Sequence, residues 1–86
     1  MQQQNKGTIV VVVSGVETTI TYNENEPLKN VIDAALKETG NQGRKNEEWQ
    51  LKYNGAVIND WMSKVETFGF PKNAVLYVSL REGVLG

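Results

Sequence analysis

The chain contains neither cysteine nor histidine among its 86 residues. It therefore has no thiolate nucleophile, no imidazole base, no disulfide and no usual zinc site. These absences remove the side chains on which most independent catalysis depends. We expect a protein that is not an enzyme and that needs neither a metal nor a cofactor.

An excess of charge of one sign is also lacking, as are long apolar runs. Nine Lys and Arg against ten Asp and Glu leave a formal net charge of −1, which argues against a nucleic-acid or anionic-membrane partner. The longest apolar run, Ile9 to Val13, is too short to cross a bilayer. The first residues, Met1 to Lys6, are polar where a secretory signal would be apolar. We expect a cytoplasmic protein that binds neither nucleic acid nor a membrane.

Length and composition predict one small domain. The sequence is 40% hydrophobic and 22% charged, which is ordinary for a soluble globular chain of this size. We expect a flexible N-terminal arm over residues 1–6, a folded domain over residues 7–80 and a flexible C-terminal tail over residues 81–86.

The dipeptide Ser14-Gly15 predicts a β-hairpin. It lies between a β-branched run, residues 9–13, and an alternating segment, residues 16–22. Closing the hairpin there places Val13 opposite Val16. The same register places Val11 opposite Thr18 and Ile9 opposite Ile20. It also gathers the apolar side chains on one face, which we expect to be the core: Ile9, Val11, Val13, Ile20 and Tyr22.

An amphipathic helix is predicted after Pro27, which suits the first helical position. Gly40 is well placed just past its end, and residues 41–48 read as a polar loop. The apolar residues of this segment recur at helical spacing and form one stripe: Leu28, Val31, Ile32, Ala35 and Leu36.

A second hairpin is predicted at Asn54-Gly55, between residues 49–53 and 56–58. Residues 60–72 are irregular, and we expect Val65, Phe68 and Phe70 to close one end of the core, with Gly69 adopting a positive φ. The last strand is predicted over residues 74–80. This order predicts an α+β fold, a β-grasp in which a mixed sheet of four or five strands curls around one helix and its first and last strands are parallel neighbours.

Five segments in this order and spacing resemble ubiquitin and its relatives, over roughly residues 7–86. They are the Ser14-Gly15 turn with the Thr-Thr-Ile-Thr that follows, Pro27–Val31, Leu51–Gly55, Lys64–Phe70 and Leu76–Arg81. In ubiquitin-like modifiers the C-terminal carboxylate is adenylated, passed to an enzyme thiolate and then joined to a target. The resemblance thus implies a monomeric protein modifier whose partners are an activating enzyme, a conjugating enzyme, a deconjugating protease and a modified target.

The resemblance gives roles to the last six residues. It implies conjugation through Gly86 and recognition of the tail that precedes it. Six residues beyond Leu80 can extend roughly 20 Å, enough to enter an enzyme channel. Glycine lacks a Cβ and leaves the terminal carbonyl open to attack. The tail-recognition residues are Arg81, Glu82, Gly83, Val84 and Leu85.

Two features depart from the family pattern. Such modifiers, and the sulfur carriers that share their fold, usually end in Gly-Gly, whereas Leu85 is the penultimate residue here. The central isoleucine of ubiquitin's exposed recognition patch falls at Lys52. We therefore expect this chain to have partners of its own rather than the readers of ubiquitin.

Several residues allow a second interpretation. Gly86 is either the conjugated residue or an incidental last residue, and Arg81 either selects the activating enzyme or is a solvated charge. Val10, Val12, Lys52 and Tyr77 form either a partner surface or ordinary surface. Lys6 is either an acceptor for further copies or a solubilising charge. The alternative functions are a non-covalent β-grasp adaptor or subunit and, third, a sulfur carrier.

Overall fold

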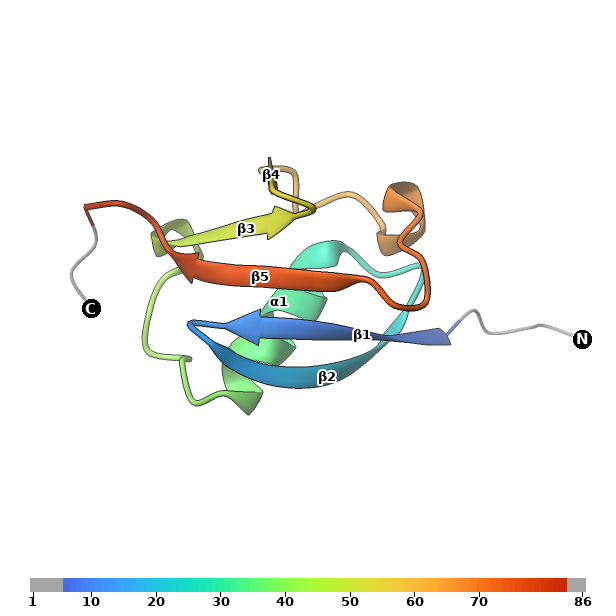
Figure 1. Ribbon diagram of the computed structural model, residues 1–86. Helices are drawn as coiled ribbons and strands as arrows, with labels where there is room; N and C mark the ends of the chain where they lie inside the picture. Colours follow the sequence, from blue (N-terminus) through green and yellow to red (C-terminus); the bar gives the residue numbers. More distant parts are fainter. Residues whose placement is uncertain (1–5, 84–86) are drawn as a thin grey trace, which may run out of the picture.

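A computed structural model describes residues 6–83 and contains one five-stranded sheet and one α-helix (Figure 1). The strands follow the sheet order β2-β1-β5-β3-β4. Two short 3₁₀ helices, η1 and η2, lie in the connections. The elements are β1 (Lys6–Val13), β2 (Val16–Asn23), α1 (Leu28–Glu38), η1 (Asn46–Glu48), β3 (Trp49–Tyr53), β4 (Ala56–Ile58), η2 (Val65–Phe68) and β5 (Val75–Leu80).

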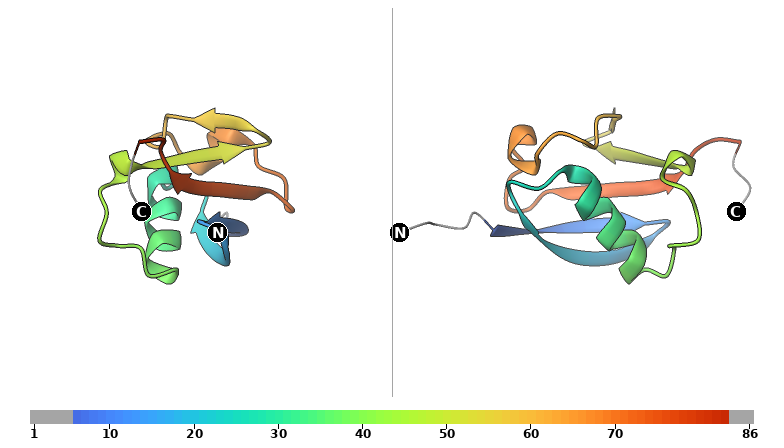
Figure 2. Two further views of the ribbon diagram at one scale, coloured as in Figure 1. Left: turned by 60° about the vertical axis from the view of Figure 1, so that its left-hand side comes forward. Right: turned by 180° about the vertical axis from the view of Figure 1, so that it is seen from behind.

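The sheet is mixed, because its central pair is parallel. β1 runs parallel to β5, while the β1–β2, β3–β4 and β3–β5 pairs are antiparallel. The helix α1 lies across one face of this sheet and leaves the other face open (Figure 2). The predicted β-grasp architecture, including the parallel pairing of the first and last strands, is confirmed.

Both predicted hairpins are present. Val13 lies opposite Val16, and the predicted register continues through the β1–β2 pair. In both turns the two central residues have positive φ: 48° and 84° at Ser14 and Gly15, and 52° and 80° at Asn54 and Gly55. Positive φ at both positions characterises the type I′ turn, whose twist matches that of the strands it joins.

The core lies between α1 and the sheet, and the predicted apolar stripe of the helix faces it. All five stripe residues are buried, as are the inward residues of β1. The end of the core is closed by Val65, which is buried, and by half-buried Phe68 and Phe70, whose rings stack with centroids 5.4 Å apart. Gly69 has the predicted positive φ, 62°. Beyond the stripe, the buried residues are Ile9, Val11, Val13, Ile20, Trp49, Leu51, Val65, Ala74, Leu76 and Val78.

Some element boundaries differ from the prediction. Pro27 is not the first helical residue but caps the helix, with an extended backbone (φ −67°, ψ 148°), because it forms an isolated antiparallel bridge with Lys64. Lys6 lies in β1 rather than in the arm, since it pairs with Asn23. The predicted polar loop contains η1 at its end, and β5 begins one residue later than expected.

Candidate functional site

The root of the C-terminal tail is fixed by two hydrogen bonds from Arg81. Its backbone N–H donates to the carbonyl oxygen of Glu48 at 2.9 Å, and its Nε donates to the carbonyl oxygen of Trp49 at 3.1 Å. Both acceptors lie where η1 passes into β3. The chain therefore leaves the sheet at a defined point, next to the start of β3 (Figure 1).

Glu82 and Gly83 follow, and both are exposed. Gly83 has φ +89°, a left-handed conformation that suits glycine. The remaining predicted tail residues, Val84, Leu85 and the conjugation residue Gly86, lie outside the described residues. The tail-recognition role of these residues stays a prediction.

The predicted partner-surface residues come together on the open face of the sheet. Strand pairing places Val12 beside Tyr77, and Tyr77 beside Lys52, while Val10 lies beside Val75 in the next row. Tyr77 is 54% exposed, Lys52 is exposed, and the two valines are half-buried. This arrangement forms a cross-strand row that can contact a partner, and its role as a partner surface stays a prediction.

Two further residues complete this row. Glu17 pairs with Val12 at one end, and Val57 pairs with Lys52 at the other. Val57 is 45% exposed. The hairpin registers that the two turns predict place both Glu17 and Val57 in this row, so the sequence could have identified them. We call Glu17, Val12, Tyr77, Lys52 and Val57 the open-face row.

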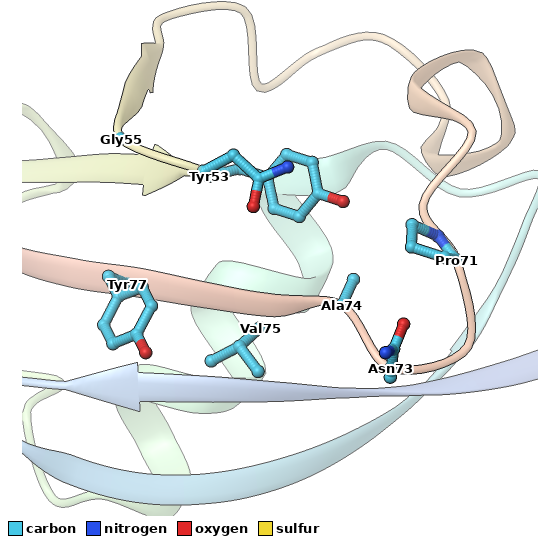
Figure 3. A pocket seen from close by; sticks show the side chains of 8 residues that line it. Tyr53, Gly55, Pro71, Asn73, Ala74, Val75 and Tyr77 are labelled. Carbon is cyan, nitrogen blue, oxygen red and sulfur yellow. The ribbon is translucent and has the colours of Figure 1, made fainter.

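A hollow of about 490 Å³ borders this row (Figure 3). The β3–β5 pairing ends at Lys52 and Tyr77, and the two strands separate beyond that pair. The hollow fills this gap and is lined by neutral side chains, including Tyr53, Asn73 and Tyr77. Its phenol and amide groups can exchange hydrogen bonds with a partner but supply no charge.

Lys6, the predicted acceptor, lies far from the tail root. It begins β1, whereas Arg81 directly follows β5. Because β1 and β5 are parallel, the start of one and the end of the other lie at opposite ends of the sheet (Figure 1). Lys6 is exposed and pairs through its backbone with Asn23.

One carboxyl group in the described chain has a clearly shifted pKa. The Ser63 hydroxyl, and then the backbone amides of Met62 and Ser63, hold the pKa of Asp60 below its ordinary value.

Within residues 6–83, no three carboxylates are grouped so that they can hold a metal ion. None of the described helices has the length and apolar content to cross a membrane.

Comparison with known proteins places the chain beside proteins of unknown function. A family model described as "Protein of Unknown function (DUF2604)" matches residues 2–86. The uncharacterized protein y4jI of Sinorhizobium fredii is 37% identical over 78 residues, which cover 91% of this chain and 60% of that protein. The chain thus spans about three-fifths of the length of this curated relative.

Solved structures with the same fold are ubiquitin-like. The ubiquitin of Caldiarchaeum subterraneum superposes with a TM-score of 0.73 at 15% identity, covering 95% of this chain and 99% of that one. A ubiquitin-like domain from Arabidopsis thaliana gives 0.67 at 19% identity, covering 87% and 77%. A protein designed on the basis of ubiquitin gives 0.73 at 16% identity, covering 94% and 95%. The predicted ubiquitin-like β-grasp fold is confirmed.

Proposed function

The chain belongs to the family of proteins of unknown function called DUF2604, and from its ubiquitin-like fold we propose that it is a protein modifier joined to targets through Gly86. The observation that carries the proposal is the fixed tail root. Arg81 is held by two hydrogen bonds, while Glu82 and Gly83 beyond it are exposed. An enzyme that binds a terminal carboxylate needs a folded body from which the C-terminal residues leave at a defined point.

The proposed chemistry begins at the carboxylate of Gly86, whether this residue is encoded last or exposed by a protease. The carboxylate attacks the α-phosphate of ATP and releases pyrophosphate, which yields an acyl adenylate. A cysteine thiolate of the activating enzyme then attacks the acyl carbon and releases AMP. The acyl group passes by thioester exchange to a cysteine of the conjugating enzyme, and an amine of the target then displaces that thiol and forms an isopeptide bond.

The thiolate nucleophiles in this scheme come from partners, which agrees with a chain that lacks cysteine and histidine and contributes the Gly86 carboxylate. The proposed partners are an activating enzyme, a conjugating enzyme, a deconjugating protease and the modified target. We place the reaction in the cytoplasm, with a monomeric modifier. Lys6 is the proposed acceptor for further copies, and its position opposite the tail root would give extended chains.

The test uses the purified chain ending at Gly86, ATP and an adenylating enzyme encoded in the same genome. We expect a covalent product with the enzyme that free thiols cleave. A matched chain lacking only Gly86 should form none, because the shortened tail no longer places a carboxylate at the reaction site. An equal yield from the shortened chain would overturn the proposal.

The open-face row supports a second candidate, a non-covalent adaptor or subunit. Tyr77, 54% exposed in the centre of the sheet, is its main observation, because a large exposed side chain there is suited to partner contact. Removing residues 82–86 should then leave partner binding intact, whereas Tyr77→Ala should weaken it. If the chain is a modifier, removing residues 82–86 instead abolishes conjugation.

A third candidate function is a sulfur carrier. It would show a sulfur-for-oxygen mass gain at Gly86.

A further inference from the structure

A recess of about 340 Å³ lies beside the tail root. Four separate segments of the chain meet there: the start of α1, η1, the loop after β4, and the residue that follows β5. The recess is distinct from the open-face row, with which it shares no residue. Its main lining residues are Lys29, Asn46, Glu47, Trp61, Met62 and Arg81.

We propose that this recess is the docking site of the activating enzyme, which inserts an aliphatic side chain against Trp61 and Met62. On the rim, the enzyme presents a carboxylate to Arg81 and a cation to Glu47. This inference rests on the proposed function and deepens it, since it names the surface by which the enzyme recognises the folded body before it takes the tail.

Exposure of Met62 is the first reason. Met62 is 70% exposed, the largest value among the exposed large hydrophobic residues of the described chain. Methionine is unbranched and polarisable, so it adapts to the shape of an apolar partner. Half-buried Trp61 adds an aromatic wall beside it. Covering this pair removes apolar area from water and favours binding.

The second reason is that the recess is formed before any partner arrives. Trp61 Nε1 donates to the carbonyl oxygen of Ile58 at 2.9 Å, and the Lys29 N–H donates to the carbonyl oxygen of Trp61 at 2.8 Å. The Asp60 carboxylate accepts the backbone N–H groups of Met62 and Ser63 at 3.0 and 3.2 Å. A loop held in this way loses little conformational entropy on binding.

Charge on the rim identifies the partner chemistry. Lys29 is already paired with Asp33 at 2.7 Å. Among residues 6–83, neither Arg81 nor Glu47 has an ion-pair partner, and both line the recess. The rim therefore offers one cation and one anion, and a complementary partner carries the opposite charges around an apolar centre.

The position of Arg81 is the third reason. It lines the recess and is also the last residue that the sheet holds before Glu82. An enzyme that binds the tail beyond Arg81 must approach the recess as well. An enzyme that binds both the recess and the tail can recognise this chain even though Lys52 replaces the isoleucine of ubiquitin's recognition patch.

The test measures ATP–pyrophosphate exchange by the adenylating enzyme at increasing concentrations of the chain. We expect Met62→Asp to raise the KM for the chain by about tenfold with little change in kcat, because the recess contributes to docking and not to the chemical step. Met62→Leu should keep the wild-type KM. Glu47→Lys should raise the KM several-fold. The matched control is Val16→Asp, which changes another exposed hydrophobic residue, 53% exposed, on β2.

The outcomes separate this inference from the proposed function. If wild type and Val16→Asp are activated and Met62→Asp has the same KM as both, the docking site is wrong and the modifier function stands. If the wild-type chain is not activated at all, both proposals fail. Circular dichroism checks that each variant folds. Should Met62→Asp unfold, Met62→Ala decides, and a KM unchanged from wild type in that variant overturns the inference.

Discussion

Arg81 donates from its Nε to the carbonyl oxygen of Trp49 at 3.1 Å, across 32 positions of the sequence. Trp49 is buried at the start of β3, so this bond joins the end of the last strand to the core. It also marks where the sheet stops holding the chain, one residue later than the end of β5. Glu82 and Gly83, both exposed, follow this fixed point.

Replacing Arg81 by alanine removes this side-chain bond and keeps the backbone bond to Glu48. We expect the free energy of unfolding to fall by about 0.5–1.5 kcal/mol, the usual net value of one hydrogen bond. Urea denaturation measures it. Lys45→Ala is the control, since it removes an exposed cation in a loop and should change stability by less than about 0.5 kcal/mol. Equal stability of the two variants would contradict the proposed anchoring.

Neighbouring residues on β5 should differ sharply in their effect on stability, because they face opposite sides of the sheet. Leu76 is fully buried against the core, whereas Tyr77 is 54% exposed. Leu76→Ala leaves a cavity and should cost about 2–5 kcal/mol. Tyr77→Ala should cost less than about 1 kcal/mol, through lost cross-strand contacts. Thermal and urea unfolding of both variants check this, and similar losses would be inconsistent with the observed strand register.

The fold was predictable because turn chemistry and periodicity agree along the chain. Ser14-Gly15 sets the β1–β2 register, and one residue of slip would turn Val11 and Val13 outward. The helix likewise follows from its apolar stripe. Shorter features were not predictable, because η1 covers three residues and shows no period, and Lys6 joins β1 through its pairing with Asn23, which lies far along the sequence.

The turn at Asn54-Gly55 tests whether a glycine is required where the backbone adopts a positive φ. Gly55 has φ +80°, where a Cβ is strained even though it would meet no atom within 4 Å apart from those of its chain neighbours. Gly55→Ala should therefore destabilise the protein by about 1–2 kcal/mol. Gly43→Ala is a matched control, since Gly43 has open space and no positive φ, and the change should be neutral or stabilising by up to about 1 kcal/mol. Equal unfolding midpoints for the two variants would count against the type I′ turn.

The two candidate sites, the open-face row and the recess, differ in how far they can be predicted from the sequence. The open-face row follows from strand alternation and hairpin register, which place Val12, Tyr77 and Lys52 on one face. The recess does not, because Lys29, Met62 and Arg81 come from segments with no shared period or motif. Only the packing of the irregular loop after β4 beside α1 and the tail root brings them together.

Asp60 offers a direct test of how that loop is held. The Ser63 hydroxyl is the largest cause of its lowered pKa, so Ser63→Ala should raise the pKa of Asp60 toward its ordinary value of 3.8. Carboxyl carbon NMR during an acid titration measures this. Ser79→Ala, on β5, is the control and should leave the titration of Asp60 unchanged.

The sign of the effect on stability follows from the lowered pKa. The folded state favours the ionised form of Asp60, so its contribution is complete above the unfolded pKa and disappears as the pH falls through the lower folded value. Wild type should therefore lose stability relative to Ser63→Ala as the pH drops below about 4. Identical Asp60 titrations in the two proteins would show that the Ser63 hydroxyl does not hold this carboxylate, and the preformed recess beside Met62 would lose one of its supports.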